Sequence, residues 1–444
     1  MRLDRLVFIV SAVVLSAVAV FMAGMYSGHK KTLVFRWINQ GYADLKGFYA
    51  TFRESSLPLS HLGPHRGRGE GVTAGAGITD GKLIFLSGFF GNSNALRLIR
   101  RDGSVVAEWP VDYFTLFPDR SYKPGAPVKS ILSDIHGAEI HPNGDVAFNF
   151  EYLGTVKMDR CGTVLWTRAS QTHHSLEIAP DGGYWVLDRR TTPGDDPSYS
   201  PLAGRYAEDL AEKLSADGEV EWSFSIPRMQ FDGGMKAILT ASFRTQNDRE
   251  YRDRELIHAN RLTMLRPEMA DAFPMFAAGD LLISDKFSNA IAVHDGKTGA
   301  LKWFQVGPFL QQHDAEFRAD GKITLFNNNA FDDAEYQYGS PAETHLSNIM
   351  AVDPATGATE VIYGDREGEQ LFSIIRGHHQ SLPGGGILIT EFSGGRVLEV
   401  DAERKTVWEF VNAYDSDYVA EVTGATLLPE SYFTVADWTC TARG

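Results

Sequence analysis

Six copies of one short pattern constrain the fold of this chain more than any other feature. Each copy is a turn, most often containing glycine, followed by a strand that ends in an aromatic residue. The copies close at Trp109, Trp166, Trp222, Trp303, Tyr363 and Trp408. A second turn with an alternating strand precedes each copy, as in "PNGDVAFNF" and "PDGGYWVLD". Alternation with a period of two between Gly and Asx turns is typical of antiparallel strands, so each unit is expected to be a four-stranded sheet.

Such a sheet cannot bury its faces alone, whereas six sheets stacked around an axis cover one another. The sequence therefore predicts an all-β protein, a six-bladed β-propeller over residues 71–444. The aromatic residue that ends each unit is expected to pack between blades. The C-terminal "TGATLLPESYFTVADW" is expected to supply a strand that helps to close the ring. Two insertions interrupt the repeat. Residues 191–214 are expected to form a polar loop with a short helix, and residues 228–255 a charged helical stretch.

The N-terminus is strongly apolar. No charged residue occurs from Leu6 to Ser27, and a helix of this length rises roughly 33 Å, about the thickness of the hydrocarbon core of a bilayer. A cleavable signal peptide has a shorter apolar core, so residues 1–28 are predicted to be a single-pass transmembrane anchor, followed by a juxtamembrane spacer over residues 29–70. Basic residues flank both ends of the segment and do not set its orientation. The long chain after one N-terminal anchor favours a periplasmic or extracellular location for the bulk.

Charge and cysteine content narrow the function classes. A formal net charge of -15, with no basic stripe interleaved with aromatic residues, argues against a nucleic-acid partner. Any anionic ligand must then meet a local positive site. Cys161 and Cys440 are the only cysteines, so the chain has no disulfide framework. One bridge between them in an oxidising compartment and two unpaired cysteines both remain open.

Histidines recur at one position of the repeat. His136, His174 and His313 each precede their turn by six residues, and His258 and the pair His378 and His379 hold the corresponding place in two other units. The strand after each is the first of its blade, and the first strand of a propeller blade is the innermost. These side chains are therefore expected to meet in one axial pocket. A metal site, acid–base catalysis and a nucleophilic histidine all fit such a cluster. His294, at an outer turn, is expected to face solvent.

At these residues the chain resembles the bacterial arylsulfotransferase family. Members are six-bladed propellers that move a sulfuryl group from a phenolic sulfate ester to a phenol through a sulfated histidine. "QHDAEFRADGKITLFNNN" is similar to the segment with the histidine nucleophile, "ELIHANRL" to the His-x-Asn motif, and "THHSLEIAPDGG" to a segment with another active-site histidine. The resemblance covers roughly residues 130–435.

The resemblance implies a role for each of five residues. His313 is the nucleophile, and His258, Asn260 and Lys286 donate to the sulfuryl oxygens and the leaving phenolate. His174 takes the proton of the incoming phenol. An aryl sulfate and a phenol are the implied substrates, with neither a metal nor a soluble cofactor. The chain departs from the family pattern in two places, with Lys286 where the family has an arginine and Asn327 where it usually has an aspartate.

Two other classes compete with this interpretation. One is a non-catalytic, membrane-anchored propeller that binds a protein or a glycan and keeps the histidines for structure. The other is a quinoprotein dehydrogenase, which the aromatic-ended Gly repeats also suggest. That group generally needs an eight-bladed chain and a calcium site, and the sequence has no carboxylate cluster for one. The sequence does not indicate an oligomeric state.

Overall fold

The computed structural model describes residues 3–30, 32, 34–35, 58–119, 129–192, 196–202, 206–245, 255–329 and 347–440. The chain divides into two units, Met1–Ser60 and His61–Gly444.

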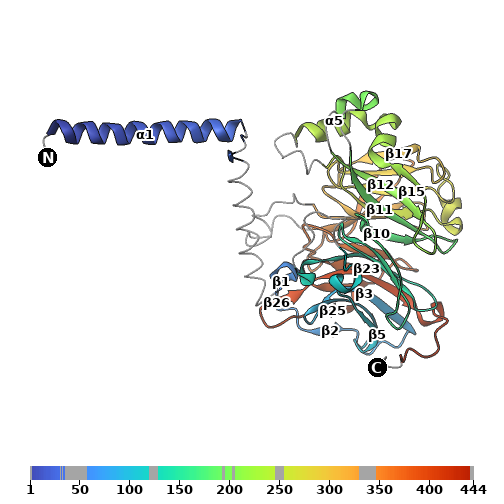
Figure 1. The fold of residues 1–444 in the computed structure, drawn as a ribbon. Coiled ribbons are helices and arrows are strands. Elements are labelled where there is room, and N and C mark those ends of the chain that lie inside the picture. The colour runs from blue at the N-terminus through green and yellow to red at the C-terminus, as the bar shows by residue number, and fades with distance from the viewer. Residues whose placement is uncertain are drawn as a thin grey trace. The chain divides into compact units, whose positions relative to one another are not determined.

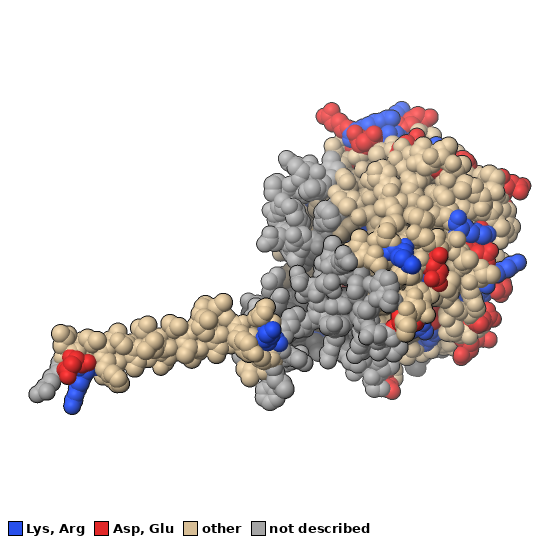
Figure 2. Space-filling model, turned by 90° about the horizontal axis from the view of Figure 1, so that it is seen from above, with Lys and Arg blue, Asp and Glu red and all other residues tan. Residues whose placement is uncertain are grey.

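The first unit contains helix α1 (Leu3–His29). Its side chains are exposed, and charged residues are seen only toward its ends (Figure 2). Its length and apolar composition suit either a membrane anchor or a signal sequence. Most of the predicted spacer, residues 36–57, lies outside the described residues.

The second unit is a six-bladed β-propeller, as the repeat predicts (Figure 1). Four blades each consist of four consecutive strands. The first two are β6 (Ile135–Ile140), β7 (Val146–Phe150), β8 (Gly154–Met158) and β9 (Val164–Arg168), followed by β10 (His173–Ile178), β11 (Tyr184–Thr191), β12 (Ala207–Leu214) and β13 (Val220–Ser225). The next two are β14 (Ala259–Met264), β15 (Leu281–Asp285), β16 (Ala290–His294) and β17 (Leu301–Val306), followed by β18 (His313–Phe317), β19 (Ile323–Asn327), β20 (Asn348–Val352) and β21 (Thr359–Tyr363). The first strands of successive blades contact one another around the axis.

The two remaining blades combine strands from both ends of this unit. One contains β22 (His378–Ser381), β23 (Ile387–Glu391), β24 (Arg396–Val400) and β25 (Thr406–Val411), with β2 (Gly71–Ala74) added at its outer edge. The other contains β3 (Lys82–Phe90), β4 (Ser93–Ile99) and β5 (Val105–Pro110), with β27 (Val422–Pro429) as its innermost strand. The prediction that the C-terminal stretch supplies a closing strand is confirmed. Closure therefore uses backbone hydrogen bonds from both ends of the unit.

The repeated aromatic residues join neighbouring blades. The indole N–H of Trp109 donates to the carbonyl of Asp159, that of Trp166 to Ala216, and that of Trp408 to Arg101. In each case the acceptor lies in the outer turn of the next blade. Trp109 and Trp408 are fully buried. The indole ring thus fills the gap between two sheets while its one polar atom is satisfied, which confirms the expected packing.

The insertions fit the predictions only in part. The second is helical, with α4 (Ile226–Gln230), a π-helical turn η4 (Phe231–Met235) and α5 (Lys236–Thr245), while residues 246–254 lie outside the described part. In the first insertion the expected short helix is confined to the 3-10 helix η3 (Pro197–Leu202). The helix-forming composition of "AEDLAEKL" instead forms β12, because pairing with β11 and β13 outweighs its local preference.

Short elements complete the described fold. These are η1 (Leu59–His61), α3 (Tyr113–Leu116), η2 (Ser130–Leu132), η5 (Pro267–Ala272), η7 (Glu430–Tyr432), and a two-stranded sheet of β1 (Leu62–Pro64) and β26 (Tyr418–Ala420). His61 anchors this N-terminal segment of the propeller unit. Its ring stacks on Phe89 at 4.4 Å, and Nδ1 lies 3.0 Å from a carboxylate oxygen of Glu421. Burial alone would lower the pKa of His61, but Glu421 and Asp134 outweigh it and raise the pKa to about 9.

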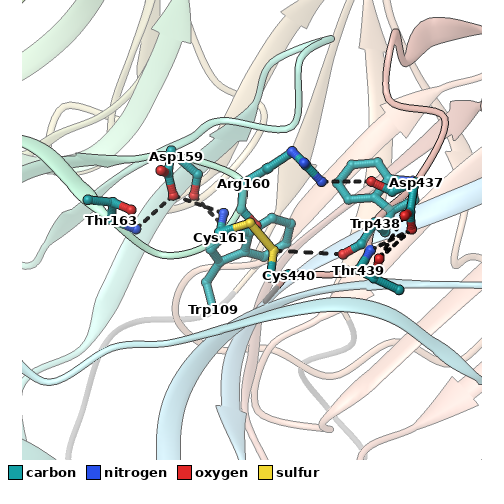
Figure 3. Close-up of a disulfide and its surroundings, with 9 residues drawn as sticks. All are labelled: Trp109, Asp159, Arg160, Cys161, Thr163, Asp437, Trp438, Thr439 and Cys440. Carbon is teal, nitrogen blue, oxygen red and sulfur yellow. Dashed lines mark hydrogen bonds between the residues drawn. A yellow bond between two sulfur atoms is a disulfide. The ribbon is translucent and has the colours of Figure 1, made fainter. Parts of the chain in front are cut away.

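A disulfide joins Cys161 to Cys440 (Figure 3), which settles the alternative that the sequence left open. Cys161 lies in the turn between β8 and β9, and the bridge attaches the C-terminal tail to that turn. The neighbouring Trp438 packs edge-on against Trp109 at 6.4 Å, and Arg160 donates to the carbonyl of Asp437. The tail therefore holds the blade that closes the ring to the blade that follows it.

Reducing this disulfide is expected to destabilise the propeller without changing its fold. The bridge spans 279 residues of sequence, and bridges that close long loops typically contribute about 2–4 kcal/mol by restricting the unfolded chain. A reductant should lower the melting temperature of the wild type by roughly 5–10 °C. The double variant Cys161→Ser/Cys440→Ser should melt at the lower temperature with or without reductant. Equal melting temperatures for the oxidised wild type and the double variant would contradict a stabilising role.

Candidate active site

The innermost strands of all six blades surround a cavity of about 60 Å³ on the propeller axis. By volume it has room for about four or five water-sized groups, enough for a small tetrahedral anion. Its lining includes His136, His174, His313, His378, Asn260, Arg261 and Arg376, together with two carboxyl groups, Glu139 and Asp314. The cavity is therefore rich in nitrogen donors, although the chain as a whole is acidic.

The structure brings together histidines from four blades. His174 lies at the centre of the group, with its ring centroid 3.8 Å from that of His136, 5.0 Å from His258 and 6.0 Å from His313. The close contact of His136 with His174 depends on a glycine. A Cβ atom at Gly137 would lie 2.1 Å from the carbonyl oxygen of His174, so no other residue allows β6 and β10 to approach so closely.

Three blades share an irregular backbone at the entry of their innermost strand. His174, His258 and Asp314 all have positive φ, between 53° and 55°, a conformation that is uncommon for non-glycine residues. Each lies at or beside a break in the pairing register of β10, β14 or β18 with the next strand. Bulges of this kind turn a side chain out of the regular alternation of a strand. The same kind of backbone irregularity therefore shapes the site in three blades.

His313 is held in one tautomer. Its Nδ1 lies 2.7 Å from the side-chain oxygen of Asn328, and the amide nitrogen of Asn328 donates to the carbonyls of Ser373 and Arg376. Because the Asn328 nitrogen is used in this way, its oxygen accepts, and Nδ1 of His313 must carry the proton. Burial, followed by the charge of Lys286, lowers the pKa of His313 to about 3. The ring is therefore neutral near pH 7, with the lone pair on Nε2.

His258 has a different environment. Its Nδ1 hydrogen-bonds to the carboxylate of Glu255, which also pairs with Arg189. Burial would raise the pKa of Glu255, but His258 and Arg189 lower it to about 2, so this carboxylate is ionised. The His258 side chain is 15% exposed and does not line the axial cavity. It has both a carboxylate partner and access to solvent.

Asn260 and Lys286 support the site in different ways. Asn260 lines the cavity, and its amide nitrogen donates to the carbonyl of Gln312, next to His313. Lys286 is buried, and its backbone N–H donates to the carbonyl of His258. It does not line the cavity, but its charge makes the largest electrostatic contribution to the lowered pKa of His313.

Two other histidines do not lie where the sequence predicts. His379 is fully buried beside the site, where it hydrogen-bonds to Asp314 and Thr324, and only its neighbour His378 lines the cavity. Successive side chains of a strand point to opposite faces, so both could not reach the axis. His294 is buried rather than exposed, because it packs against Phe224 across the gap between blades.

Sequence reasoning missed several residues of the site. It singled out Asn327, whose side chain is used by local backbone and by Asn348, whereas the adjacent Asn328 contacts His313. It also missed Glu255 and Arg376. The run of three asparagines and the arginine two residues before His378 were visible signals, but neither shows which side chain turns inward.

Among the residues that the structure describes, two groups of carboxylates and a histidine are close enough to hold a metal ion. They are His61 with Asp134 and Glu421, and Asp314 with Glu316 and His378. Each already contains an ion pair with a guanidinium, Arg376 on Asp134 and Arg261 on Asp314. These cations already balance part of the negative charge that would attract a metal.

The site is thus a histidine cluster on the axis of a six-bladed propeller, with one neutral imidazole held by an amide. The profile of the Arylsulfotransferase (ASST) family matches residues 137–413, more than half of the chain. The protein belongs to this family, as its motifs predict. A search among curated proteins found no match.

Solved structures are similar only in general architecture. A protein of unknown function from Bacteroides caccae is 14% identical with a TM-score of 0.48, and the match covers 79% of this chain and 99% of that one. Virginiamycin B lyase from Staphylococcus aureus is 12% identical with a TM-score of 0.41, over 83% and 97% of the two chains. Likenesses this distant carry no argument about function.

NMR can test the state of His313. Its ring is expected to stay neutral between pH 5 and 8, with the proton on Nδ1, because its pKa is lowered to about 3 and Asn328 accepts from Nδ1. Long-range proton–nitrogen spectra of the protein labelled at histidine distinguish the two tautomers. Asn328→Ala should populate both. A wild-type titration midpoint near 6.5, or a proton on Nε2, would contradict the assignment.

Proposed function

We propose that the protein transfers a sulfuryl group from an aryl sulfate to a phenol through a sulfated His313. The observation that carries the proposal is the neutral His313 ring, whose Nδ1–H is held by Asn328 at 2.7 Å and whose Nε2 keeps its lone pair. An imidazole in this state is unprotonated near pH 7 and can present the lone pair of Nε2 for attack. Family membership supports the reaction class.

The reaction has two half-reactions. In the first, the lone pair of Nε2 attacks sulfur, the bond from sulfur to the aryl oxygen breaks, and its electron pair leaves with the phenolate. In the second, the oxygen of the acceptor phenol attacks the same sulfur, and the nitrogen–sulfur bond breaks to return its pair to Nε2. Asn260 and the charge of Lys286 stabilise the negative charge that spreads over the sulfuryl oxygens. No redox step occurs, and no further co-reactant is needed.

The acceptor proton passes to His258 in this scheme, rather than to His174 as the resemblance implies. His174 is buried against His136, and its Nδ1 lies 2.8 Å from Nδ1 of His173. Burial and these neighbouring histidines lower the pKa of His174 well below 6.5, so it accepts a proton poorly. His258 is more exposed, and its Nδ1 hydrogen-bonds to the ionised carboxylate of Glu255. It can take the proton from the phenol and return one to a leaving phenolate.

The scheme suits an exported enzyme anchored by α1. The disulfide between Cys161 and Cys440 favours an oxidising compartment outside the cytoplasm. Nucleotide sulfate donors are lacking there, whereas the proposed reaction needs only an aryl sulfate and a phenol. The N-terminal helix would keep the propeller at the membrane.

Mass spectrometry tests the covalent step. Incubation with 4-nitrophenyl sulfate is expected to add one sulfuryl mass to the protein, and His313→Ala should abolish both the adduct and turnover because the attacking nitrogen is gone. His141→Gln is a matched control, since His141 hydrogen-bonds to Tyr184 away from the cavity; it should form the adduct normally. An adduct that persists in His313→Ala, or none across a panel of aryl sulfates with folded protein, would favour a binding propeller instead.

The role of Glu255 is tested by varying the acidity of the acceptor. In Glu255→Gln the His258 ring loses its carboxylate, so transfer to phenol itself should fall about 10²-fold. Release of 4-nitrophenolate in the first half-reaction should change little, because this leaving group needs no proton. Acceptor phenols acidic enough to be ionised at the assay pH should restore much of the rate. The same loss for every acceptor would argue against a role in proton transfer.

A further inference from the structure

Arg376 brings a guanidinium into the axial cavity from the blade that begins with β22. Its Nη2 lies 2.8 Å from a carboxylate oxygen of Asp134 and 2.9 Å from one of Glu151, and its guanidinium lies over the ring of Phe392. Its Nη1 is buried and has no hydrogen-bond partner among the described residues, although the side chain lines the cavity. The two carboxylates thus hold Nη2 and leave Nη1 unused.

His136 offers a second unused donor in the same cavity. Its side chain is 5% exposed, and neither ring nitrogen has a hydrogen-bond partner within the part of the chain that the structure describes. Its nearest carboxylate oxygen, on Glu151, is 3.9 Å from Nδ1. Buried polar groups are nearly always paired, and an unpaired one is costly. Two such groups that line one cavity indicate a ligand with acceptor oxygens.

The position of this pair relative to His313 suits the sulfuryl group. Asn328 contacts both Arg376 and the nucleophile. Its nitrogen donates to the backbone carbonyl of Arg376, and its oxygen accepts from His313. His174 connects them again, with its ring beside those of both His136 and His313. The unused N–H groups and the nucleophile therefore belong to one cavity.

We propose that Arg376, together with His136, binds the oxygens of the sulfuryl group that His313 attacks. A guanidinium donates in a planar fork that suits sulfate oxygens, whereas an ammonium acts as a point charge. Lys286 has no guanidinium and does not line the cavity. Arg376 supplies the guanidinium from another blade. Asp134 and Glu151 position it, and the assignment rests on the proposed sulfuryl transfer.

Kinetics of the full-length protein test this role. Arg376→Lys keeps the charge but cannot hold both carboxylates and still donate into the cavity. It is expected to lower kcat/KM for 4-nitrophenyl sulfate about 10- to 100-fold. Arg396→Lys is the matched control, because Arg396 is a similarly buried, ion-paired arginine of the same blade that does not line the cavity. It should change kcat/KM less than threefold. Equal effects of the two substitutions would overturn the proposal.

A binding measurement separates this proposal from the catalytic one. Equilibrium dialysis of 4-nitrophenyl sulfate against His313→Ala measures affinity without reaction, and adding Arg376→Lys should weaken it about tenfold or more. Adding His136→Gln instead should weaken the affinity several-fold. This variant leaves the ion pairs of Arg376 intact, so it tests the site even if the arginine variant fails to fold. If these variants lose binding but the wild type forms no adduct, sulfuryl transfer is refuted while the anion-binding role of Arg376 and His136 is supported. An adduct in the wild type with unchanged affinity in both variants would refute the anion site alone.

Discussion

The pairing of β27 with β3 is the constraint on which the rest of the structure depends. It runs from Val422 opposite Gly88 to Pro429 opposite Lys82, with one shift of register between Val422 and Gly424. It makes the last described strand the first strand of a blade whose other strands come from the opposite end of the propeller. Without it, β3 would expose an unpaired edge, and the inner strands would not surround a cavity. The added strand β2 strengthens the junction with the preceding blade, and the disulfide tail fastens the closing blade to the blade that follows it.

Ring closure also creates the chemistry of the site. Once six inner strands meet, the histidines at their entries lose most of their contact with water. Burial disfavours the charged form of an imidazole, which is the main reason why the pKa of His313 falls to about 3. Because the site is enclosed, the charge of the group that each histidine contacts matters more than it would in water. His258 is paired with the carboxylate of Glu255 and His313 with the neutral amide of Asn328, so two residues of one type in neighbouring blades have partners of different charge.

Much of the fold could be read from the sequence because its determinants are local and repeated. Turn residues set the strands, and one aromatic residue per unit fills the gap between sheets, as Trp109 and Trp408 do. Histidines at the same position of successive repeats likewise predicted that His136, His174, His258 and His313 lie together. Prediction failed where alternation or pairing decided the outcome. His379 points away from the axis although His378 points toward it, and a helix-like segment became β12 between two other strands.

The sequence by itself determined the number of blades, the closing strand and the blades that place a histidine near the axis, since each depends on residues at fixed intervals within a unit. Only the tertiary structure decided the partners of those histidines. Asn328 directly follows β19, Glu255 lies shortly before β14, and Arg376 is itself a left-handed residue before β22, and none of these positions is periodic. The pairing of Cys161 with Cys440 likewise required the ring to close, because their 279-residue separation leaves no local signal. Contacts between distant segments depend on how the blades pack, and a repeat pattern carries no information about that packing.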